Sequence, residues 1–425
     1  MVNLDTGNEE GDAILVVGGG IAGVTSAIEA AEAGCQVVLV EKSAYLGGHV
    51  AAFHRYFPKL CPPPCGLEID FRRLQNNPRI TVYTLAEVES LNGSPGNYEA
   101  VIRIMPRYVT AACTLCGECE RVCPVEIPDA FNCGITKTKA IHLPHRMAFP
   151  AQYMIDDDAC SNDCSLCADT CRYLAIDLKQ KETKKTLRVA SVVFATGWAP
   201  YDAAKIDNLG FGTCANVVTN VMLERMAAPD GPTAGRIVRP SDGKAPRAVA
   251  FVQCAGSRDR NHLPYCSGVC CTASLKQAGY IHSQYPEAKI SMFYIDLRTP
   301  GHLEDFASKA IAANGIELIK GKVGKVQEQP VSRDLLVTAE DVLGGRKIAR
   351  EYDIVVLAVG IVPQSAGLPG CVALDEFGFA STNGGPGVLA AGCVKRPAEV
   401  AVSIRDATGA ALKAMQSVAG RANHG

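Results

Sequence analysis

The sequence predicts an α/β protein in which two domains built on parallel β-sheets carry an inserted, cysteine-rich module. Three observations predict it: a glycine-rich turn between an apolar strand and a helix near the N-terminus, two runs of four cysteines, and a second strand–turn–helix pattern after residue 246. The 425 residues are enough for two or three domains, because one domain usually takes about 100–200 residues.

The first element is a G-x-G-x-x-G turn at residues 18–23. It follows an apolar run at 13–17 and precedes a helical pattern at 24–33 and a second strand at 36–40. This strand–turn–helix–strand context is typical of a dinucleotide-binding fingerprint, and the alternative is a coincidental glycine turn.

Each glycine of the fingerprint has a predicted role. Gly18 permits the tight turn, Gly20 lets the backbone approach a pyrophosphate, and Gly23 lets helix and strand pack closely. The helix N-terminus is expected to face the phosphates, and Glu41, at the end of the second strand, to accept hydrogen bonds from the ribose hydroxyls.

Later glycine motifs favour FAD over a nicotinamide as the dinucleotide. A second glycine turn lies at 46–49, apolar strands at 192–197 and 355–360 end in glycine, and a further strand at 387–392 precedes Cys393, where an aspartate is usual in such flavoproteins. We expect the histidine of the second turn to pack against the flavin phosphates or sugar rather than act as an acid. The expected cofactor-binding residues are Gly18, Gly20, Ile21, Ala22, Gly23, Glu41, Lys42, Gly48, His49, Val88, Ala195, Thr196, Gly197, Gly392 and Cys393.

Two cysteine runs predict a ferredoxin-like module. The first has the spacing C-x2-C-x2-C-x3-C and ends in proline, as in bacterial segments that hold [4Fe–4S] clusters, and the second has the spacing C-x3-C-x2-C-x3-C. In that arrangement the fourth cysteine of each run serves the other cluster, so Cys123 belongs to the second cluster and Cys171 to the first. Zinc is the alternative metal, but its sites take two separated cysteine pairs. The expected ligands are Cys113, Cys116, Cys119, Cys123, Cys160, Cys164, Cys167 and Cys171.

The second dinucleotide-type domain lacks the fingerprint that binds NAD(P)H. Its first strand at 248–253 and its helix at 273–283 flank a turn that carries cysteines where the glycines belong. Without those glycines the backbone cannot readily hold a pyrophosphate, so NAD(P)H binding is not expected. The cysteines fit a third cluster, a redox-active dithiol or a packed cysteine cluster. They are Cys254, Cys266, Cys270 and Cys271.

These motifs divide the chain into five segments. The FAD-binding domain is expected in three parts, at residues 13–106, 187–245 and 354–425. The ferredoxin-like module at 107–186 and the second dinucleotide-type domain at 246–353 interrupt it.

Composition and charge argue against other classes of protein. The formal net charge of −2 is not that of a nucleic-acid-binding chain. Nineteen cysteines, an odd number gathered at metal-ligand spacings, do not indicate a disulfide framework. No stretch reaches the roughly 18 uninterrupted apolar residues of a membrane span, and no targeting segment is visible. We therefore expect a cytoplasmic protein without a membrane span of its own.

The cysteine-rich turn resembles that of the heterodisulfide reductase A-subunit family. The similarity is most specific at 252–259, 264–271 and 275–278, and it extends over 13–415. The resemblance implies a thioredoxin-reductase-type FAD fold, an inserted ferredoxin module and a third cluster on the four cysteines. Within 275–278, Lys276 is the expected catalytic residue, because a cation near the flavin stabilises its reduced form. The alternative is a solvated surface lysine.

The chain is similar to the short form of that family, found in the quinone-interacting membrane-bound oxidoreductase complex of sulfate reducers. The short form has neither the extra N-terminal domain nor the C-terminal ferredoxin extension of the methanogen members. The similarity implies two partners, a related flavoprotein subunit together with a membrane haem subunit that handles quinone, which would hold this chain at the inner membrane. It also implies electron exchange between the menaquinone pool and adenylylsulfate reductase.

Other functions stay open at this point. They are a soluble electron-bifurcating heterodisulfide reductase subunit, an NAD(P)H-dependent flavin disulfide oxidoreductase and a docking scaffold with zinc in its cysteine sites. Cys61 and Cys65 flank three prolines, which predict a stiff, extended spacer. The two thiols are expected to cap an exposed cluster or merely to pack.

Overall fold

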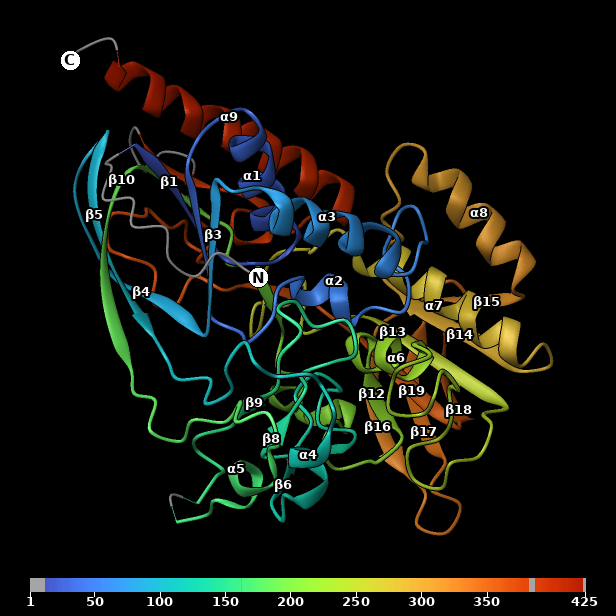
Figure 1. Ribbon diagram of the computed structural model, residues 1–425. Coiled ribbons are helices and arrows are strands. Elements are labelled where there is room, and N and C mark those ends of the chain that lie inside the picture. The colour runs from blue at the N-terminus through green and yellow to red at the C-terminus, as the bar shows by residue number, and fades with distance from the viewer. Residues whose placement is uncertain (1–11, 162, 382–386, 423–425) are drawn as a thin grey trace. The chain divides into compact units, whose positions relative to one another are not determined.

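The computed structural model describes residues 12–161, 163–381 and 387–422, and the chain divides into two compact units (Figure 1). The first unit comprises Met1–Ala52, Pro58–Trp198 and Pro363–Gly425, and the second comprises Phe53–Phe57 and Ala199–Val362.

The first unit is built on a seven-stranded sheet. One half is parallel, as in dinucleotide-binding domains, and the other half is an antiparallel hairpin. One long strand serves both halves, because its first residues pair antiparallel with the hairpin and its last residues pair parallel on both sides. The strands are β3 (Ile80–Thr84), β2 (Val37–Glu41), β1 (Ala13–Val17), β10 (Thr183–Phe194), β5 (Asn97–Ile104) and β4 (Ala86–Ser94), with β21 (Val388–Ala390) beside β10.

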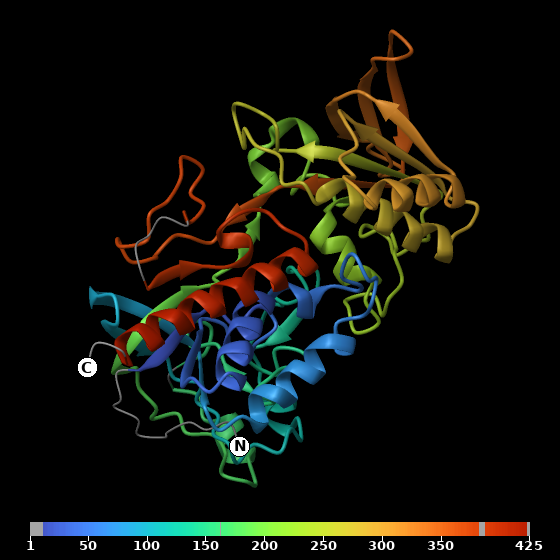
Figure 2. The same ribbon diagram turned by 90° about the horizontal axis from the view of Figure 1, so that it is seen from above.

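Helices pack on the parallel half of this sheet. The first, α1 (Ile21–Glu32), buries a face rich in alanine, and the C-terminal helix α9 (Val400–Ala422) lies along it (Figure 2). The Ser26 hydroxyl donates to the Ala407 carbonyl at 3.1 Å across this contact. The other helices of the unit's Rossmann-like part are α2 (Gly48–Ala52) and α3 (Pro64–Asn76).

The cysteine-rich module leaves the sheet after β5 and returns to it at β10. Its two short helices each begin just after the second cysteine of a run, and a small core of apolar and cysteine side chains joins the two halves. The module's elements are α4 (Glu118–Val122), β6 (Glu126–Pro128), β7 (Lys137–Lys139), β8 (Ile141–His142), β9 (Met154–Ile155) and α5 (Leu166–Thr170).

The second unit contains a five-stranded parallel sheet and a separate three-stranded antiparallel sheet. In order across the parallel sheet, the strands are β12 (Val217–Thr219), β19 (Ile354–Val359), β13 (Ala248–Ala255), β14 (Lys289–Tyr294) and β15 (Ile316–Lys320). The smaller sheet consists of β16 (Val323–Glu328), β17 (Leu335–Asp341) and β18 (Arg346–Tyr352). The helices are α6 (Asn220–Ala227), α7 (Cys270–Gln284) and α8 (Leu303–Ala313).

The boundary between the units differs from the one expected at residue 245. The chain passes from the first unit to the second at β11 (Trp198–Pro200) and returns at β20 (Ile361–Pro363), two strands that pair with each other. The short strand β12 pairs in parallel with β19, and the segment 199–245 that carries it belongs to the second unit. Because β12 has only three residues, its sequence is too short to show the alternation of a strand, and its sheet could not be predicted.

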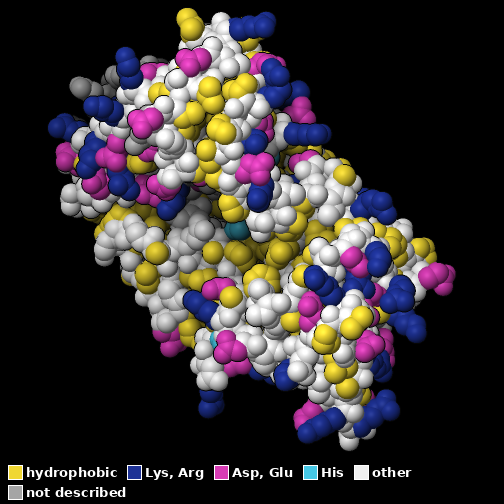
Figure 3. Space-filling model, turned by 90° about the horizontal axis from the view of Figure 1, so that it is seen from below, with side chains coloured by type: hydrophobic (Ala, Val, Ile, Leu, Met, Phe, Trp, Pro, Cys, Tyr) yellow, Lys and Arg dark blue, Asp and Glu magenta, His cyan; other side chains and the backbone are white. Residues whose placement is uncertain are grey.

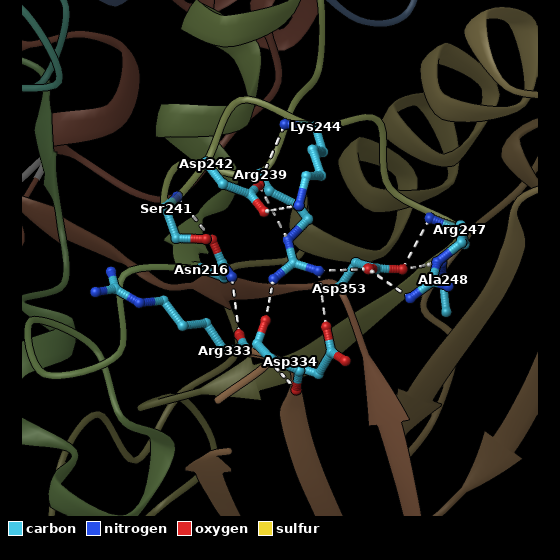
Figure 4. Close-up of polar contacts among 11 residues, drawn as sticks. Asn216, Arg239, Ser241, Asp242, Lys244, Arg247, Ala248, Arg333, Asp334 and Asp353 are labelled. Atoms are coloured by element: carbon cyan, nitrogen blue, oxygen red, sulfur yellow. Dashed lines mark hydrogen bonds and ion pairs between the residues drawn. The ribbon is translucent and has the colours of Figure 1, made fainter. Parts of the chain in front are cut away.

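A buried arginine fixes the segment that precedes β13 (Figure 4). Arg239 is 5% exposed, and its Nη1 lies 2.7 Å from an Asp334 oxygen and 2.9 Å from Asp353 Oδ1. The other oxygen of Asp353 accepts hydrogen bonds from the backbone N–H groups of Arg247 and Ala248, at 2.8 and 2.9 Å. Because each of the two buried charges has partners, the network can remain buried while it holds the start of β13 in place.

In Figure 3, acidic and basic side chains lie beside one another, and apolar side chains gather where charged ones are few. Among the helices in the described part of the chain, none has the length and apolar character needed to cross a membrane.

Candidate functional site

In the glycine turn that follows β1, close packing excludes a side chain at two of the motif's glycines, and the third has open space beside it. A Cβ at Gly18, whose φ is +108°, would lie 2.3 Å from the Ala195 carbonyl oxygen, and a Cβ at Gly23 would lie 1.7 Å from that of Gly18. A Cβ at Gly20 would meet nothing within 4 Å. The backbone at Gly20, which precedes α1, is therefore accessible to a ligand, as a pyrophosphate-binding turn requires.

Glu41 connects the turn to the end of β2. Its carboxylate accepts hydrogen bonds from the backbone N–H groups of Gly19 and of Ser43, the latter at 2.6 Å. Each carboxylate oxygen has a second lone pair with which to accept from a ribose hydroxyl. The neighbouring Lys42 is exposed and pairs with Glu87 at 2.8 Å.

The second glycine turn lies directly against the first. The Gly47 N–H donates to the Gly19 carbonyl at 2.8 Å, and a Cβ at Gly48 would lie 3.0 Å from the Cα of Gly20. Two turns that are well separated in sequence thus form one glycine-lined surface. Val88 of β4 packs against the apolar core of this sheet.

His49 is held by the tryptophan that follows the Ala-Thr-Gly motif. Its Nε2 lies 2.7 Å from the Trp198 carbonyl oxygen, and the two rings stack with centroids 4.1 Å apart. Burial lowers the pKa of His49 below its ordinary value, so the imidazole is neutral at pH 7. Sequence reasoning missed Trp198, although its position next to Gly197 was a usable signal.

The Ala-Thr-Gly segment and the closing strand meet the glycine turn from two directions. The Ala195 N–H donates to the Val17 carbonyl at 2.7 Å, and the Thr196 hydroxyl donates to the Gln364 carbonyl at 2.6 Å. Gly392 lies so close to the start of α1 that a Cβ there would be 2.8 Å from that of Ala22. Residues from four separate parts of the sequence therefore surround one place in the first unit.

Cys393 is buried and bonded within its own loop. Its thiol donates to the Ala398 carbonyl at 3.3 Å, and burial raises its pKa, so the thiol is protonated at pH 7. The nearby carboxylate is that of Asp406 on α9, which accepts a hydrogen bond from the Gly392 N–H at 2.9 Å and pairs with Lys395 at 2.7 Å. Sequence reasoning missed Asp406 because it lies 14 residues beyond the motif.

The structure brings the eight cysteines of the module together in two sets of four. One cavity is lined by Cys113, Cys116, Cys119 and Cys171. We call it the first module cavity. The second module cavity is lined by Cys123, Cys160, Cys164 and Cys167. Each set contains three cysteines of one run and the last cysteine of the other, which is the exchange that the spacing predicts.

The two module cavities have the chemistry of iron–sulfur sites. Their remaining walls are largely apolar, and the Ala175 N–H donates to the Cys171 sulfur at 3.4 Å. In the described ranges, no three His, Cys, Asp or Glu side chains converge closely enough for a single metal ion. Each set of four sulfurs instead surrounds a space, and a [4Fe–4S] cube binds its four thiolates on separate irons.

Cys254, Cys266, Cys270 and Cys271, all in the second unit, line a third cavity. Cys254 lies at the end of β13 in the left-handed region, with φ +57°, where the pairing with β19 shifts register. Such a conformation is uncommon for a residue other than glycine. Cys270 and Cys271 open helix α7. The thiols therefore occupy the strand–turn–helix position at which a dinucleotide-binding domain holds its pyrophosphate.

Lys276 is a buried lysine rather than a solvated one. It is 7% exposed, and its Nζ lies 2.7 Å from Glu224 Oε1 and donates to the Arg55 carbonyl at 2.6 Å. The rings of Phe53 and Tyr280 flank the ammonium, with centroids 5.6 and 5.7 Å away. Glu224, on α6, is a further residue that sequence reasoning missed.

The prolines between Cys61 and Cys65 form a helical turn, which corrects the extended spacer that we expected. Pro63 has φ −51° and ψ −39°, and the Cys65 N–H donates to the Pro62 carbonyl at 3.1 Å. Proline at the start of a helix is favourable because its fixed φ suits the first turn, and α3 begins here at Pro64.

Comparison with known proteins shows a relationship over most of the chain. It is 38% identical over 362 residues to an iron–sulfur A subunit of the CoB–CoM heterodisulfide reductase of Methanopyrus kandleri, covering 84% of this chain and 54% of that protein. It is 35% identical over 419 residues to the A subunit of the H2:CoB–CoM heterodisulfide, ferredoxin reductase of Methanothermobacter thermautotrophicus, covering 95% and 63%. Over most of its length the chain is homologous to the A subunits of heterodisulfide reductases. It spans only a little more than half the length of these relatives.

The chain also matches, over residues 13–58, the family described as FAD dependent oxidoreductase. Its fold is similar to the thioredoxin reductases of T. acidophilum, with TM-score 0.53 and 16% identity over 97% of this chain and 99% of that one, and of Lactococcus lactis, with TM-score 0.54 and 12% identity over 97% and 100%. The predicted α/β fold of thioredoxin-reductase type is confirmed.

Proposed function

We propose that this protein is the FAD- and iron–sulfur-containing electron-transfer subunit of a multisubunit redox complex. The observation that carries the proposal is the sorting of eight cysteines into two cavities with exchanged fourth members. Bound FAD and [4Fe–4S] clusters would supply the exchange between two-electron and one-electron transfer. The cysteines would hold the clusters, and the glycine turns would hold the flavin.

A third cluster on Cys254, Cys266, Cys270 and Cys271 is part of this proposal. The four side chains share one cavity, which favours a common centre over separately packed thiols. The N-terminus of α7 at this cavity favours anionic ligands, because the helix dipole places partial positive charge there. The same residues stand where glycines would be needed to bind NAD(P)H, which argues against an NAD(P)H-dependent disulfide oxidoreductase.

For the physiological partners, we propose those implied by the resemblance to the quinone-interacting membrane-bound oxidoreductase complex of sulfate reducers. They are a related flavoprotein subunit together with a membrane haem and quinone subunit. Adenylylsulfate reductase would be the redox partner, and the complex would exchange electrons between it and the menaquinone pool. The protein would then lie on the cytoplasmic side of the inner membrane, attached through these partners. The printed names of the relatives, which are subunits of heterodisulfide reductases, support the multisubunit setting. They also make a soluble, electron-bifurcating heterodisulfide reductase subunit the second candidate.

Chemical analysis of the anaerobically purified chain tests the proposal. We expect one FAD and about 12 irons per chain, with about 8 from the module, and EPR signals of [4Fe–4S] clusters after reduction by dithionite. NADH is expected to leave the flavin oxidised. Fewer than about 8 irons per flavin, or zinc in place of iron, would contradict it. Oxidation of the reduced protein by adenylylsulfate reductase rather than by ferredoxin separates the two candidate complexes.

We also propose that Lys276 is the cation that stabilises the reduced flavin, with Glu224 as its positioning residue. The support is that the ammonium is buried and held by Glu224 and by the Arg55 carbonyl. Arg55 lies in the segment Phe53–Phe57, which follows directly on α2, the helix that starts with the second glycine turn. The hydrogen bond from Lys276 to Arg55 therefore links Lys276 to the segment that follows the second glycine turn in sequence.

Replacement of Lys276 by methionine is expected to lower the midpoint potential of the flavin. It also leaves Glu224 buried without its partner, at a cost of about 3–5 kcal/mol in stability. The double variant Lys276→Met/Glu224→Gln removes that cost, and it should regain stability while the potential stays low. A wild-type flavin potential in both variants would show that the ion pair is purely structural.

A further inference from the structure

The three cysteine cavities differ in the charged side chains on their walls. The third cavity is lined by Arg258, Arg298 and Asp296. Arg258 Nη1 lies 2.9 Å from Asp296 Oδ2, so this lining carries two positive charges and one negative charge. The lining of the first module cavity includes the carboxylate of Glu118, and no charged side chain other than the thiols lines the second module cavity within the described residues.

Both arginines line the same cavity as the four cysteines. Positive charge on the wall of a cavity stabilises negative charge inside it. The cationic groups thus favour negative charge on these sulfurs.

The backbone around the third cavity acts in the same direction. The Gly268 N–H lies 3.4 Å from the Cys266 sulfur, and the N-terminus of the 15-residue helix α7 carries Cys270 and Cys271. The helices beside the two module cavities, α4 and α5, have five residues each and therefore only a small dipole. Of these three cavities, only the third has both the N-terminus of a long helix and arginine side chains in its lining.

A [4Fe–4S] centre on four thiolates becomes more negative when it takes up an electron. Nearby positive charge and hydrogen bonds to the sulfurs stabilise that reduced form and raise the reduction potential. Arg258, which is 24% exposed, should contribute more than the exposed Arg298, because water screens an exposed charge.

We propose that the third cavity holds the iron–sulfur centre of highest reduction potential in this chain, and that Arg258 and Arg298 set this potential. Single electrons would then collect at the third centre rather than in the ferredoxin-like module. The inference rests on the proposed function and adds to it an order of potentials among the three centres.

Potentiometric EPR titration of the anaerobically purified, full-length chain tests the order. The signal that disappears in Cys266→Ser identifies the third centre, and in the unaltered chain we expect that signal to be reduced at a higher potential than both module signals. Arg258→Gln combined with Arg298→Gln should lower the ratio of reduced to oxidised third centre at least tenfold at a given potential, a shift of about 59 mV for one electron.

Two further variants separate charge from structure. Arg258→Lys keeps the charge and should keep most of the potential. Arg260→Gln removes an exposed arginine two residues away that does not line the cavity, and it should leave the potential unchanged. An unchanged potential in the double glutamine variant, or a third centre of lower potential than both module centres, would overturn the inference. Iron analysis of each preparation keeps this failure distinct from failure of the proposed function, in which the iron itself is missing.

Discussion

Cys123→Ser is expected to abolish the iron–sulfur centre of the second cysteine run and to spare that of the first. The reason is geometric: Cys123 belongs to the first run in sequence but lines the second module cavity with Cys160, Cys164 and Cys167. Serine is a poor ligand for iron, so the preparation should lose about 4 irons per chain. Iron analysis and EPR of the reduced protein measure both effects.

Cys171→Ser is the reciprocal variant and should remove the centre of the first module cavity. Cys133→Ser serves as the control, because Cys133 is an exposed cysteine of the same module that lines neither cavity. If Cys123→Ser removed the signal assigned to Cys113, Cys116 and Cys119 instead, the exchange between the runs would be wrong.

Gly20→Val is expected to give a folded protein that does not retain FAD. A Cβ at this position meets nothing within 4 Å, and the φ of −73° is an ordinary one, so the backbone here accepts a residue that has a Cβ. The added methyl groups occupy the space through which a pyrophosphate approaches the turn. We expect a loss in flavin affinity of at least about 100-fold, which corresponds to about 3 kcal/mol. The measurement is the flavin content of the purified protein together with its circular dichroism.

Two other glycine variants serve as controls for Gly20→Val. Gly409→Ala places a methyl group in another open position, on helix α9, and should retain the flavin. Gly23→Ala places a Cβ 1.7 Å from the Gly18 carbonyl oxygen and should impair folding itself. Full flavin occupancy in Gly20→Val would show that the phosphates do not approach this turn.

Features that depend on local spacing could be predicted from the sequence. The strand, turn and helix around Gly18–Gly23 follow from apolar runs and glycines that are close together in the chain. The sorting of the module cysteines follows from two runs whose spacing matches the ferredoxin arrangement. In both cases the residues that act together are neighbours in sequence, or their pairing is dictated by a repeated pattern.

Features that depend on distant contacts could not be predicted. Lys276 bonds to a carbonyl 221 residues away, and its partner Glu224 lies far from it in sequence, on another helix. Asp406 reaches the Gly392 N–H through a contact between separate elements of the same kind. The placement of residues 199–245 depends on the pairing of a three-residue strand, which is too short to show a period.

The fold class, the dinucleotide turn and the three groups of cysteines follow from the amino-acid sequence, because each depends on residue types at fixed short spacings. The folded chain is needed to know that Lys276 is buried against a carboxylate, that the second unit begins after Trp198, and that two arginines line the third cavity. These depend on which side chains meet across the fold. Such contacts depend on the free energies of burial and of charge pairing in the folded chain. No residue pattern at a fixed spacing in the sequence predicts them.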